Sequence, residues 1–150
     1  MLSMLAWTLM TAMVVMNAKS QYCPTMRDSY PKQHECLYKN ALCGKEDSGG
    51  RCSSICNCKN GQMCSTDRDH NVTIVIHENT LPKKKRYYTC LSLWRLNECS
   101  ETEKALHRLT HRTKELKSVK VLCRCPYPKA YVTLESRYRY TCALVQVLGD

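Results

Sequence analysis

The residues in this chain best equipped for chemistry are its twelve cysteines. A cysteine thiolate can ligate zinc, act as a nucleophile or redox centre, or pair with another cysteine. The spacing C-x-C occurs twice and C-x3-C once, whereas C-x-x-C, the spacing of zinc ribbons and thioredoxin-like sites, does not occur. We therefore expect structural disulfides, with the pairing left open, from Cys23, Cys36, Cys43, Cys52, Cys56, Cys58, Cys64, Cys90, Cys99, Cys123, Cys125 and Cys142.

Motifs for catalysis and cofactor binding are missing from the sequence. It contains no G-x-S-x-G, no H-E-x-x-H and no glycine-rich phosphate loop, and it has only five glycines. Glu103, His107 and His111 are spaced by four, so on a helix they would share a face that could bind zinc weakly. A solvated polar face is the plainer interpretation, because further ligands are missing. We expect a protein that is not an enzyme, with no catalytic residue, metal or cofactor.

The amino-terminal segment has the pattern of a secretory leader. Residues 4–16 form an apolar run too short to span a bilayer comfortably, and small residues surround a cleavage point after Ser20. The pattern predicts a signal peptide over 1–20 and a mature start at Gln21, with a membrane anchor as the alternative. Secretion would place the cysteines in an oxidising compartment, where disulfides persist. The sequon N-V-T then predicts a glycosylation acceptor at Asn71.

The densest charge run is Lys83-Lys84-Lys85-Arg86, followed by Tyr87. Its plainest interpretation is a hydrated loop between two strands; a convertase cleavage site, and a contact with an acidic receptor or an anionic membrane, are the alternatives. The net charge of +10 favours anionic partners without naming one. We do not expect a nucleic-acid partner, because the chain is predicted to be secreted and lacks a nucleic-acid recognition motif. We predict that these five residues form a contact loop for an extracellular protein target.

Cysteine density divides the mature chain into two regions. Seven cysteines lie in 21–65 and five in 66–150, so at least one bridge should join the regions if all pair within the chain. The chain has no phenylalanine and few aliphatic residues, so we expect covalent cross-links to supply much of its stability. The prediction is one cross-linked unit over 21–150, with a loop-rich part in 21–65 and a hairpin-rich part in 66–150.

The second region carries strand patterns. Residues 72–76 are β-branched throughout, and 87–94 are their expected partner across a polar link at 77–86. Residues 130–135 lead through a turn into 137–145, where Tyr138, Tyr140, Cys142 and Leu144 alternate with polar residues. We expect that alternating face to be buried. The fold class is therefore a small, disulfide-rich, mainly β protein.

The segment 100–122 is ambiguous. The capping-box order S-E-T-E at 100–103 and leucines along one helical stripe predict a short helix over 101–114. Val119 and Val121 alternate instead as a strand would, from about residue 118.

An internal sequence repeat links the two regions. C-x-C at 56–58 is followed by Y-T-C at 88–90, and C-x-C at 123–125 is followed by Y-T-C at 140–142. This repeat predicts two related hairpins, each cross-linked by disulfides.

These motifs carry a resemblance to known proteins. C-x-C-x5-C, K-R-Y-Y-T-C-L, C-S-E, C-R-C-P and R-Y-T-C, spread over roughly 52–142, resemble the scoloptoxin class of centipede venom polypeptides. They also resemble, more weakly, the arthropod giant-lens group of EGF-receptor signalling antagonists. The venom class implies a mainly β toxin; the giant-lens group implies a protein that binds a growth factor.

The leading hypothesis from sequence is a secreted, toxin-like polypeptide that presents rigid basic loops to a receptor or ion channel. Cross-linked loops lose less entropy on binding than flexible ones. The alternative is an extracellular signalling antagonist that sequesters a growth factor. A protease inhibitor would need a bait loop, and none is identifiable.

Overall fold

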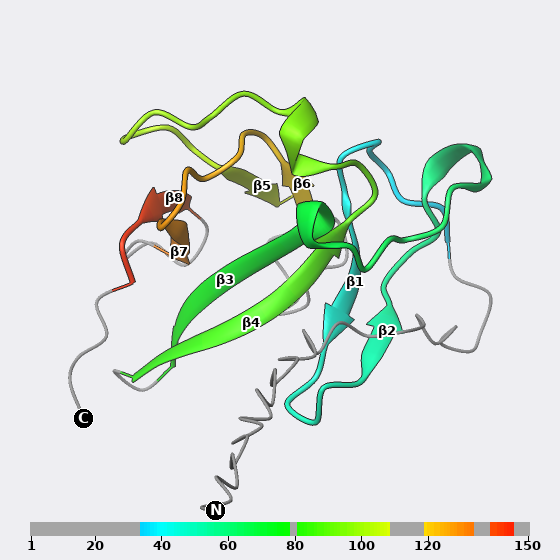
Figure 1. The fold of residues 1–150 in the computed structure, drawn as a ribbon, viewed down its shortest axis with the longest axis horizontal. Coiled ribbons are helices and arrows are strands. Elements are labelled where there is room, and N and C mark those ends of the chain that lie inside the picture. The colour runs from blue at the N-terminus through cyan, green and yellow to red at the C-terminus, as the bar shows by residue number, and fades with distance from the viewer. Residues whose placement is uncertain (1–33, 79–80, 109–118, 134–138, 146–150) are drawn as a thin grey trace, which may run out of the picture.

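The computed structural model describes residues 34–78, 81–108, 119–133 and 139–145. The predicted leader, Cys23 and His111 lie outside these residues. The described chain is mainly β (Figure 1), and none of its helices is long and apolar enough to cross a membrane. Its helical turns are η1 (Lys59–Gly61), η2 (Arg68–His70) and η3 (Leu93–Arg95). Its strands are β1 (Leu42–Glu46), β2 (Cys52–Ser54), β3 (Asn71–Glu78), β4 (Leu81–Thr89), β5 (Leu106–Arg108), β6 (Val119–Val121), β7 (Ala130–Thr133) and β8 (Tyr140–Ala143).

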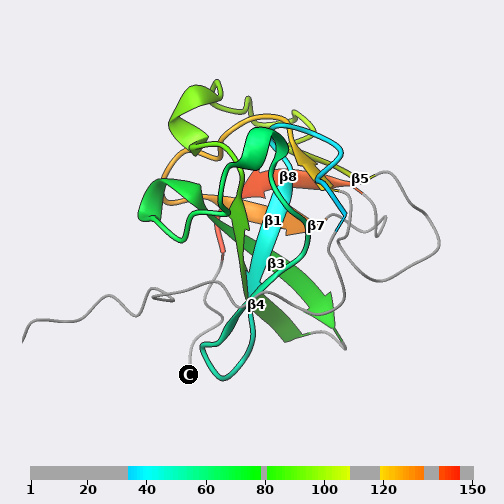
Figure 2. The same ribbon diagram turned by 90° about the vertical axis from the view of Figure 1, so that its right-hand side faces the viewer.

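All of these strands belong to one sheet in the order β2-β1-β4-β3-β7-β8-β5-β6. Neighbouring strands are antiparallel except at the centre, where β3 pairs in parallel with β7. Figure 2 shows β7 and β8 running across the direction of β1, so the two halves of the sheet face each other. The β1 side of the sheet also approaches β6 at the opposite edge. The Val121 amide of β6 donates to the Asn40 carbonyl, and Ala41 forms a bridge with Lys120.

The inward faces of the curled sheet share one core. Val72 and Ile74 of β3 are fully buried, as expected for β-branched residues on a packed strand. Each such side chain contributes about 1.5–3 kcal/mol on burial. Core residues also come from β1 and from β4 to β8: Leu42, Tyr87, Leu106, Val119, Val121, Tyr131, Tyr140 and Cys142. This cluster therefore joins both halves of the sheet.

The predicted internal repeat is confirmed in the structure. In both copies the second cysteine of C-x-C is bridged to the cysteine of Y-T-C, and the first is bridged to a cysteine upstream. The pairs are Cys36–Cys56 and Cys58–Cys90 in the first repeat, and Cys99–Cys123 and Cys125–Cys142 in the second. The first repeat has an additional bridge, Cys43–Cys64, and Cys52 is also disulfide-bonded. The Cys58–Cys90 bridge joins the two sequence regions defined by cysteine density.

The backbone repeats in the same way. The residue before each upstream cysteine forms a parallel bridge with the middle residue of C-x-C, Glu35 with Asn57 and Glu98 with Arg124. Each copy then consists of two hairpins, β1–β2 with β3–β4 and β5–β6 with β7–β8. The equivalent strands β3 and β7 form the parallel pair that joins the copies.

Most predicted strands are present with altered limits. Residues 72–76 lie in β3, and the predicted strands near 130–135 and 137–145 appear as β7 and β8. In β8, Tyr140 and Cys142 are buried as predicted, but Leu144 lies beyond the strand and is 60% exposed. The loop-rich part also contains the β1–β2 hairpin, whose turn is closed by Asp47 accepting from the Gly49 and Arg51 amides.

The predicted helix over 101–114 is wrong over its described part, residues 101–108. The capping-box contact does form, because Glu103 Oε2 accepts from the Ser100 amide at 3.0 Å. It closes a turn and not a helix, since the Ala105 amide donates to Tyr140 O and Leu106 pairs with Val121. Pairing across the sheet therefore overrides the local helix signal.

The Tyr131 hydroxyl ties β7 to the second C-x-C segment. It donates to Cys123 O at 3.0 Å and accepts from the Cys125 amide at 3.4 Å. Tyr131→Phe should lower the free energy of unfolding by about 1–3 kcal/mol, because the buried Cys123 carbonyl loses its donor. Denaturant unfolding measures this change. Tyr127→Phe is the matched control, since Tyr127 is 96% exposed, and a loss of similar size in both variants would contradict the assignment.

Two buried phenols should make the fold sensitive to alkali. Burial raises the pKa of both Tyr87 and Tyr131 to about 12. The neutral phenol is the form that suits the core, so its contribution is complete below pH 10, the ordinary pKa of tyrosine. That contribution should be lost as the pH rises from about 10 through 12. A titration of tyrosinate absorbance against circular dichroism should show these two groups ionising last, together with unfolding; their ionisation at pH 10 in a folded protein would contradict this.

Candidate functional site

The basic run predicted as a loop is part of a strand. Residues 83–86 lie in β4, opposite residues 73–76 of β3, with Lys84 facing Val75 and Lys85 facing Ile74. The prediction of a loop at 77–86 was wrong because the β-branched residues of β3 offer pairing partners along its whole length. β3 ends at Glu78 and β4 begins at Leu81, so the basic residues form one side of a long hairpin (Figure 1).

Strand alternation sends the basic side chains to opposite faces of the hairpin. Lys83 and Lys85 share a face with Tyr87, and Lys84 and Arg86 share the other face. Lys83 and Lys84 are exposed, Lys85 and Arg86 are partly buried, and Tyr87 is only 7% exposed. Tyr87 is therefore a core residue and not part of the predicted contact surface. The exposed Lys83 and Lys84 lie nearer the tip of the hairpin than Arg86, opposite Ile76 and Val75 of β3.

Arg86 is fixed by a contact within the fold. Its Nη1 lies 2.9 Å from Glu46 Oε2 on β1, and the same oxygen accepts from the Tyr88 hydroxyl at 3.2 Å. Burial, and then the nearby Glu46 carboxylate, raise the pKa of Tyr88. These bonds attach β4 to β1 on the outer face of the sheet. Within the basic run, Arg86 is therefore bonded to β1, and the side chains of Lys83 and Lys84 are the exposed ones.

The sequon residue Asn71 begins β3 and is partly buried. Its Oδ1 is buried and has no hydrogen-bond partner in the described part of the chain. Glycosylation at Asn71 stays a prediction.

The predicted zinc-binding face of Glu103, His107 and His111 does not form over its described part. His107 lies on β5 opposite Lys120, while the Glu103 carboxylate points back to Ser100. Glu103 and His107 therefore do not share a helical face. The sulfur clusters among the described residues consist of disulfide-bonded cysteines, which have no thiolate to offer a metal.

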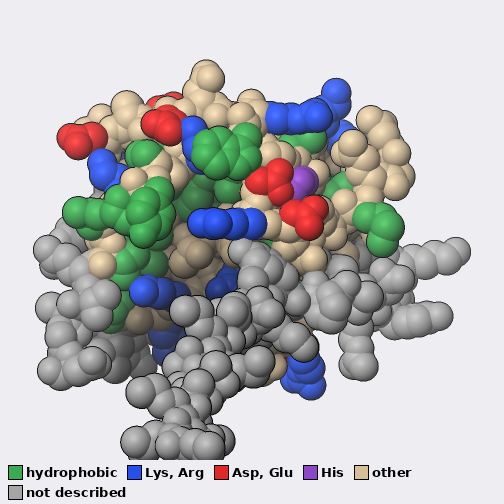
Figure 3. Space-filling model, viewed as in Figure 1, with side chains coloured by type: hydrophobic (Ala, Val, Ile, Leu, Met, Phe, Trp, Pro, Cys, Tyr) green, Lys and Arg blue, Asp and Glu red, His purple; other side chains and the backbone are tan. Residues whose placement is uncertain are grey.

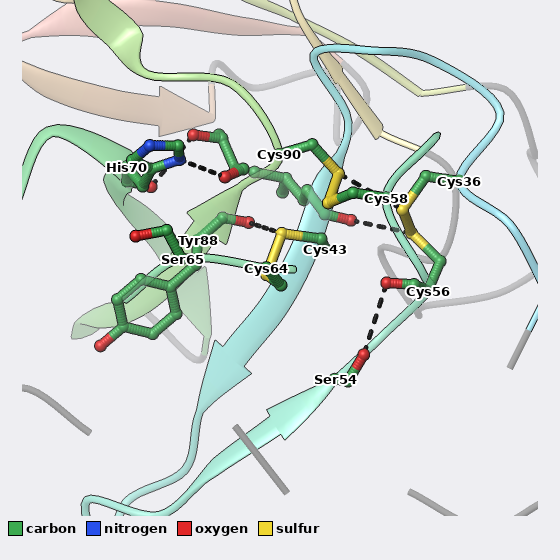
Figure 4. The surroundings of a disulfide bond; sticks show 12 residues. Cys36, Cys43, Ser54, Cys56, Cys58, Cys64, Ser65, His70, Tyr88 and Cys90 are labelled. Carbon is green, nitrogen blue, oxygen red and sulfur yellow. Dashed lines mark hydrogen bonds between the residues drawn. A yellow bond between two sulfur atoms is a disulfide. The ribbon is translucent and has the colours of Figure 1, made fainter. Parts of the chain in front are cut away.

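A serine, a histidine and two carboxylates meet near η2 without forming a catalytic relay. His70 Nδ1 lies 2.6 Å from the Thr89 carbonyl, and Ser65 Oγ donates to Asp67. Figure 4 shows Ser65 and His70 beside β4 and the disulfides. Because Ser65 donates to a carboxylate and the histidine ring binds the backbone, this arrangement serves the fold.

The sequence analysis did not predict a cation–π contact on the surface, between Arg124 and Trp94. Trp94 is 70% exposed, and the Arg124 guanidinium lies 4.0 Å from its ring centroid. Arg124 is held in turn by Glu98 at 2.6 Å. Figure 3 shows hydrophobic, basic and acidic side chains interleaved on one face of the molecule. Ser92, which caps the Trp94 amide, was the one local signal available.

No family model and no curated protein matches the chain. Among solved structures, the chain is similar to "unliganded Argos" in its crystal structure, with 20% identity and a TM-score of 0.49. The match covers 79% of this chain and 63% of the Argos chain, so this chain spans less than two thirds of that protein's length. None of these comparisons supports the resemblance to centipede venom polypeptides.

The tie between Glu46 and Arg86 predicts a modest stability change. Glu46→Gln keeps an acceptor for the Tyr88 hydroxyl but removes the charge that faces Arg86, so it should cost about 1 kcal/mol, because Arg86 is partly solvated. The pKa of Tyr88 should fall toward its ordinary value. Denaturant unfolding and tyrosinate absorbance measure both effects. Glu101→Gln is the control, since that side chain is 89% exposed, and equal losses in the two variants would contradict the prediction.

Proposed function

We propose that this chain is a secreted, non-enzymatic binding protein that sequesters a soluble, acidic polypeptide of the growth-factor class. The observation that carries the proposal is the β3–β4 hairpin, which presents Lys83 and Lys84 near its tip. The hairpin is attached to the fold at its other end by the Cys58–Cys90 bridge and by the Arg86–Glu46 pair.

Such a hairpin is suited to binding because its conformation is fixed before a partner arrives. Disulfides and cross-strand hydrogen bonds reduce the entropy lost on association. Exposed lysines attract an acidic partner over several ångströms and raise the association rate. Cross-linked cysteines throughout the described chain agree with an oxidising, extracellular location.

Capture of a folded polypeptide is favoured over blockage of a channel by the form of the surface. Lys83 and Lys84 lie on opposite faces of an extended hairpin, so a partner that contacts both must be large enough to surround the hairpin edge, as a folded polypeptide is. The sequence motifs that resemble the giant-lens group support the same function. The receptor or channel hypothesis, and binding to an anionic membrane, become alternative outcomes of the test.

The test is retention of a soluble ligand by the immobilised protein. Wild-type protein should retain a growth factor from conditioned medium, identified by mass spectrometry and then titrated as a purified protein. The variant Lys83→Glu/Lys84→Glu should bind that ligand about tenfold more weakly, with a slower association rate. Added salt should weaken the wild type more than the variant.

The control variant is Lys39→Glu/Arg68→Glu, which changes the net charge equally at two exposed residues outside β4. It should retain wild-type affinity. Equal weakening in both variants would assign the effect to net charge and not to the hairpin. Binding to cell membranes or lipid vesicles with no soluble ligand retained would overturn sequestration.

A further inference from the structure

The additional bridge of the first repeat lies against the two bridges that the repeats share. Figure 4 shows the three disulfides side by side. The sulfur atoms of two overlapping triplets all lie within 4.8 Å of one another, and both triplets contain Cys58. The triplets are Cys43, Cys58 and Cys64, and Cys36, Cys58 and Cys90. Two of the bridges approach within 3.6 Å, from Cys90 Sγ to Cys36 Sγ.

Solvent reaches this cluster mainly at one residue. Five of its six cysteines are at most 6% exposed, and Cys43 is fully buried. Cys64 is partly exposed and follows Met63, which is 87% exposed. An external thiol therefore meets the cluster at the Cys64 sulfur.

We infer that the Cys43–Cys64 bridge is a thiol-exchange site through which a low-molecular-weight thiol rearranges the whole cluster. In the first step a thiolate attacks Cys64 Sγ and forms a mixed disulfide with it. The Cys43–Cys64 bond breaks, and its electron pair leaves with Cys43 as a thiolate.

Two internal steps follow, each between sulfurs already in proximity. The Cys43 thiolate attacks Cys58, which forms Cys43–Cys58 and releases Cys90. The Cys90 thiolate then attacks Cys36, which forms Cys36–Cys90 and releases Cys56. Cys56 takes a proton, so the external thiol is oxidised to the mixed disulfide while one protein cysteine is reduced.

The final thiol is formed in a protected position. Cys56 is 6% exposed, and its Sγ lies 3.5 Å from the Leu42 carbonyl, which can accept the S–H hydrogen bond. A buried thiol of this kind is a poor nucleophile, so it returns slowly along the same path. The exchange also moves the anchor of β4 from Cys58 to Cys36, because Cys90 directly follows that strand.

The second repeat is the internal comparison. Its Cys99, Cys125 and Cys142 sulfurs also lie within 4.8 Å of one another, but it has only two bridges in the described chain. The position after Leu106 is His107, where the first repeat has Cys43 after Leu42. The three-bridge exchange unit is therefore a property of the first repeat.

The experiment treats the folded, oxidised protein with reduced glutathione for short times and quenches the exchange with acid. The thiols are then alkylated with a maleimide in mildly acidic denaturant, so that buried thiols react, and the peptides are mapped by mass spectrometry. The expected products are a glutathione adduct on Cys64, an alkylated Cys56, and new Cys43–Cys58 and Cys36–Cys90 links. The native Cys43–Cys64 and Cys58–Cys90 peptides should be lost together. An adduct on Cys64 with an alkylated Cys43 and intact neighbours would overturn the relay, and first attack in the second repeat would overturn the entry site.

The variant Cys43→Ala/Cys64→Ala tests the entry site separately. It leaves the first repeat with the two bridges that both repeats share, Cys36–Cys56 and Cys58–Cys90, and with the disulfide of Cys52. Its Cys36–Cys56 and Cys58–Cys90 bridges should resist glutathione at concentrations that rearrange the wild type. Loss of these bridges at the wild-type rate would contradict entry at Cys64, whether or not the hairpin binds a ligand.

Discussion

The constraint on which the rest of the structure depends is the bridge from the second cysteine of C-x-C to the cysteine of Y-T-C. Cys58–Cys90 and Cys125–Cys142 attach the end of a hairpin to the segment that precedes it. The C-x-C segment is itself fixed by a second bridge and by a parallel backbone pairing, Glu35 with Asn57 or Glu98 with Arg124. Each bridge contributes about 2–4 kcal/mol by restricting the unfolded chain. A core of this size, without phenylalanine, can then hold eight strands.

The fold was predictable from the sequence where the signal was local. The β-branched run of β3 and the alternation in β8 identified their strands because each pattern is contained in a few consecutive residues. The helix at 101–108 was mispredicted because a real contact, Glu103 to Ser100, closes a turn in either structure. Whether this segment forms a helix or a strand depends on its pairing with Tyr140, which is distant in sequence. The disulfide pairing could not be predicted either, although both repeats pair the second cysteine of C-x-C with the cysteine of Y-T-C.

The site was less predictable than the fold, because charge runs have no preferred secondary structure. Lys83 and Lys84 were identified as surface residues, yet their place on a strand depends on the partner residues in β3. Tyr87 was assigned to the surface from its neighbours, whereas alternation along β4 turns it into the core. The contact of Trp94 with Arg124 could not be predicted from the Ser92 cap alone, since the two residues lie thirty positions apart and are brought together by pairing of the segments around Glu98 and Arg124.

The two repeats share a framework but differ where the proposed activities lie. The hairpin of the first repeat extends over 71–89, whereas its counterpart extends over 130–143. The first repeat also holds the third bridge, which places a partly exposed sulfur beside the bridge that anchors β4. A longer hairpin projects charge away from the core, and a more complex anchor controls how that hairpin is attached. The second repeat keeps the framework that the two repeats share, so the proposed hairpin contact and the proposed thiol exchange both fall where the first repeat departs from that framework.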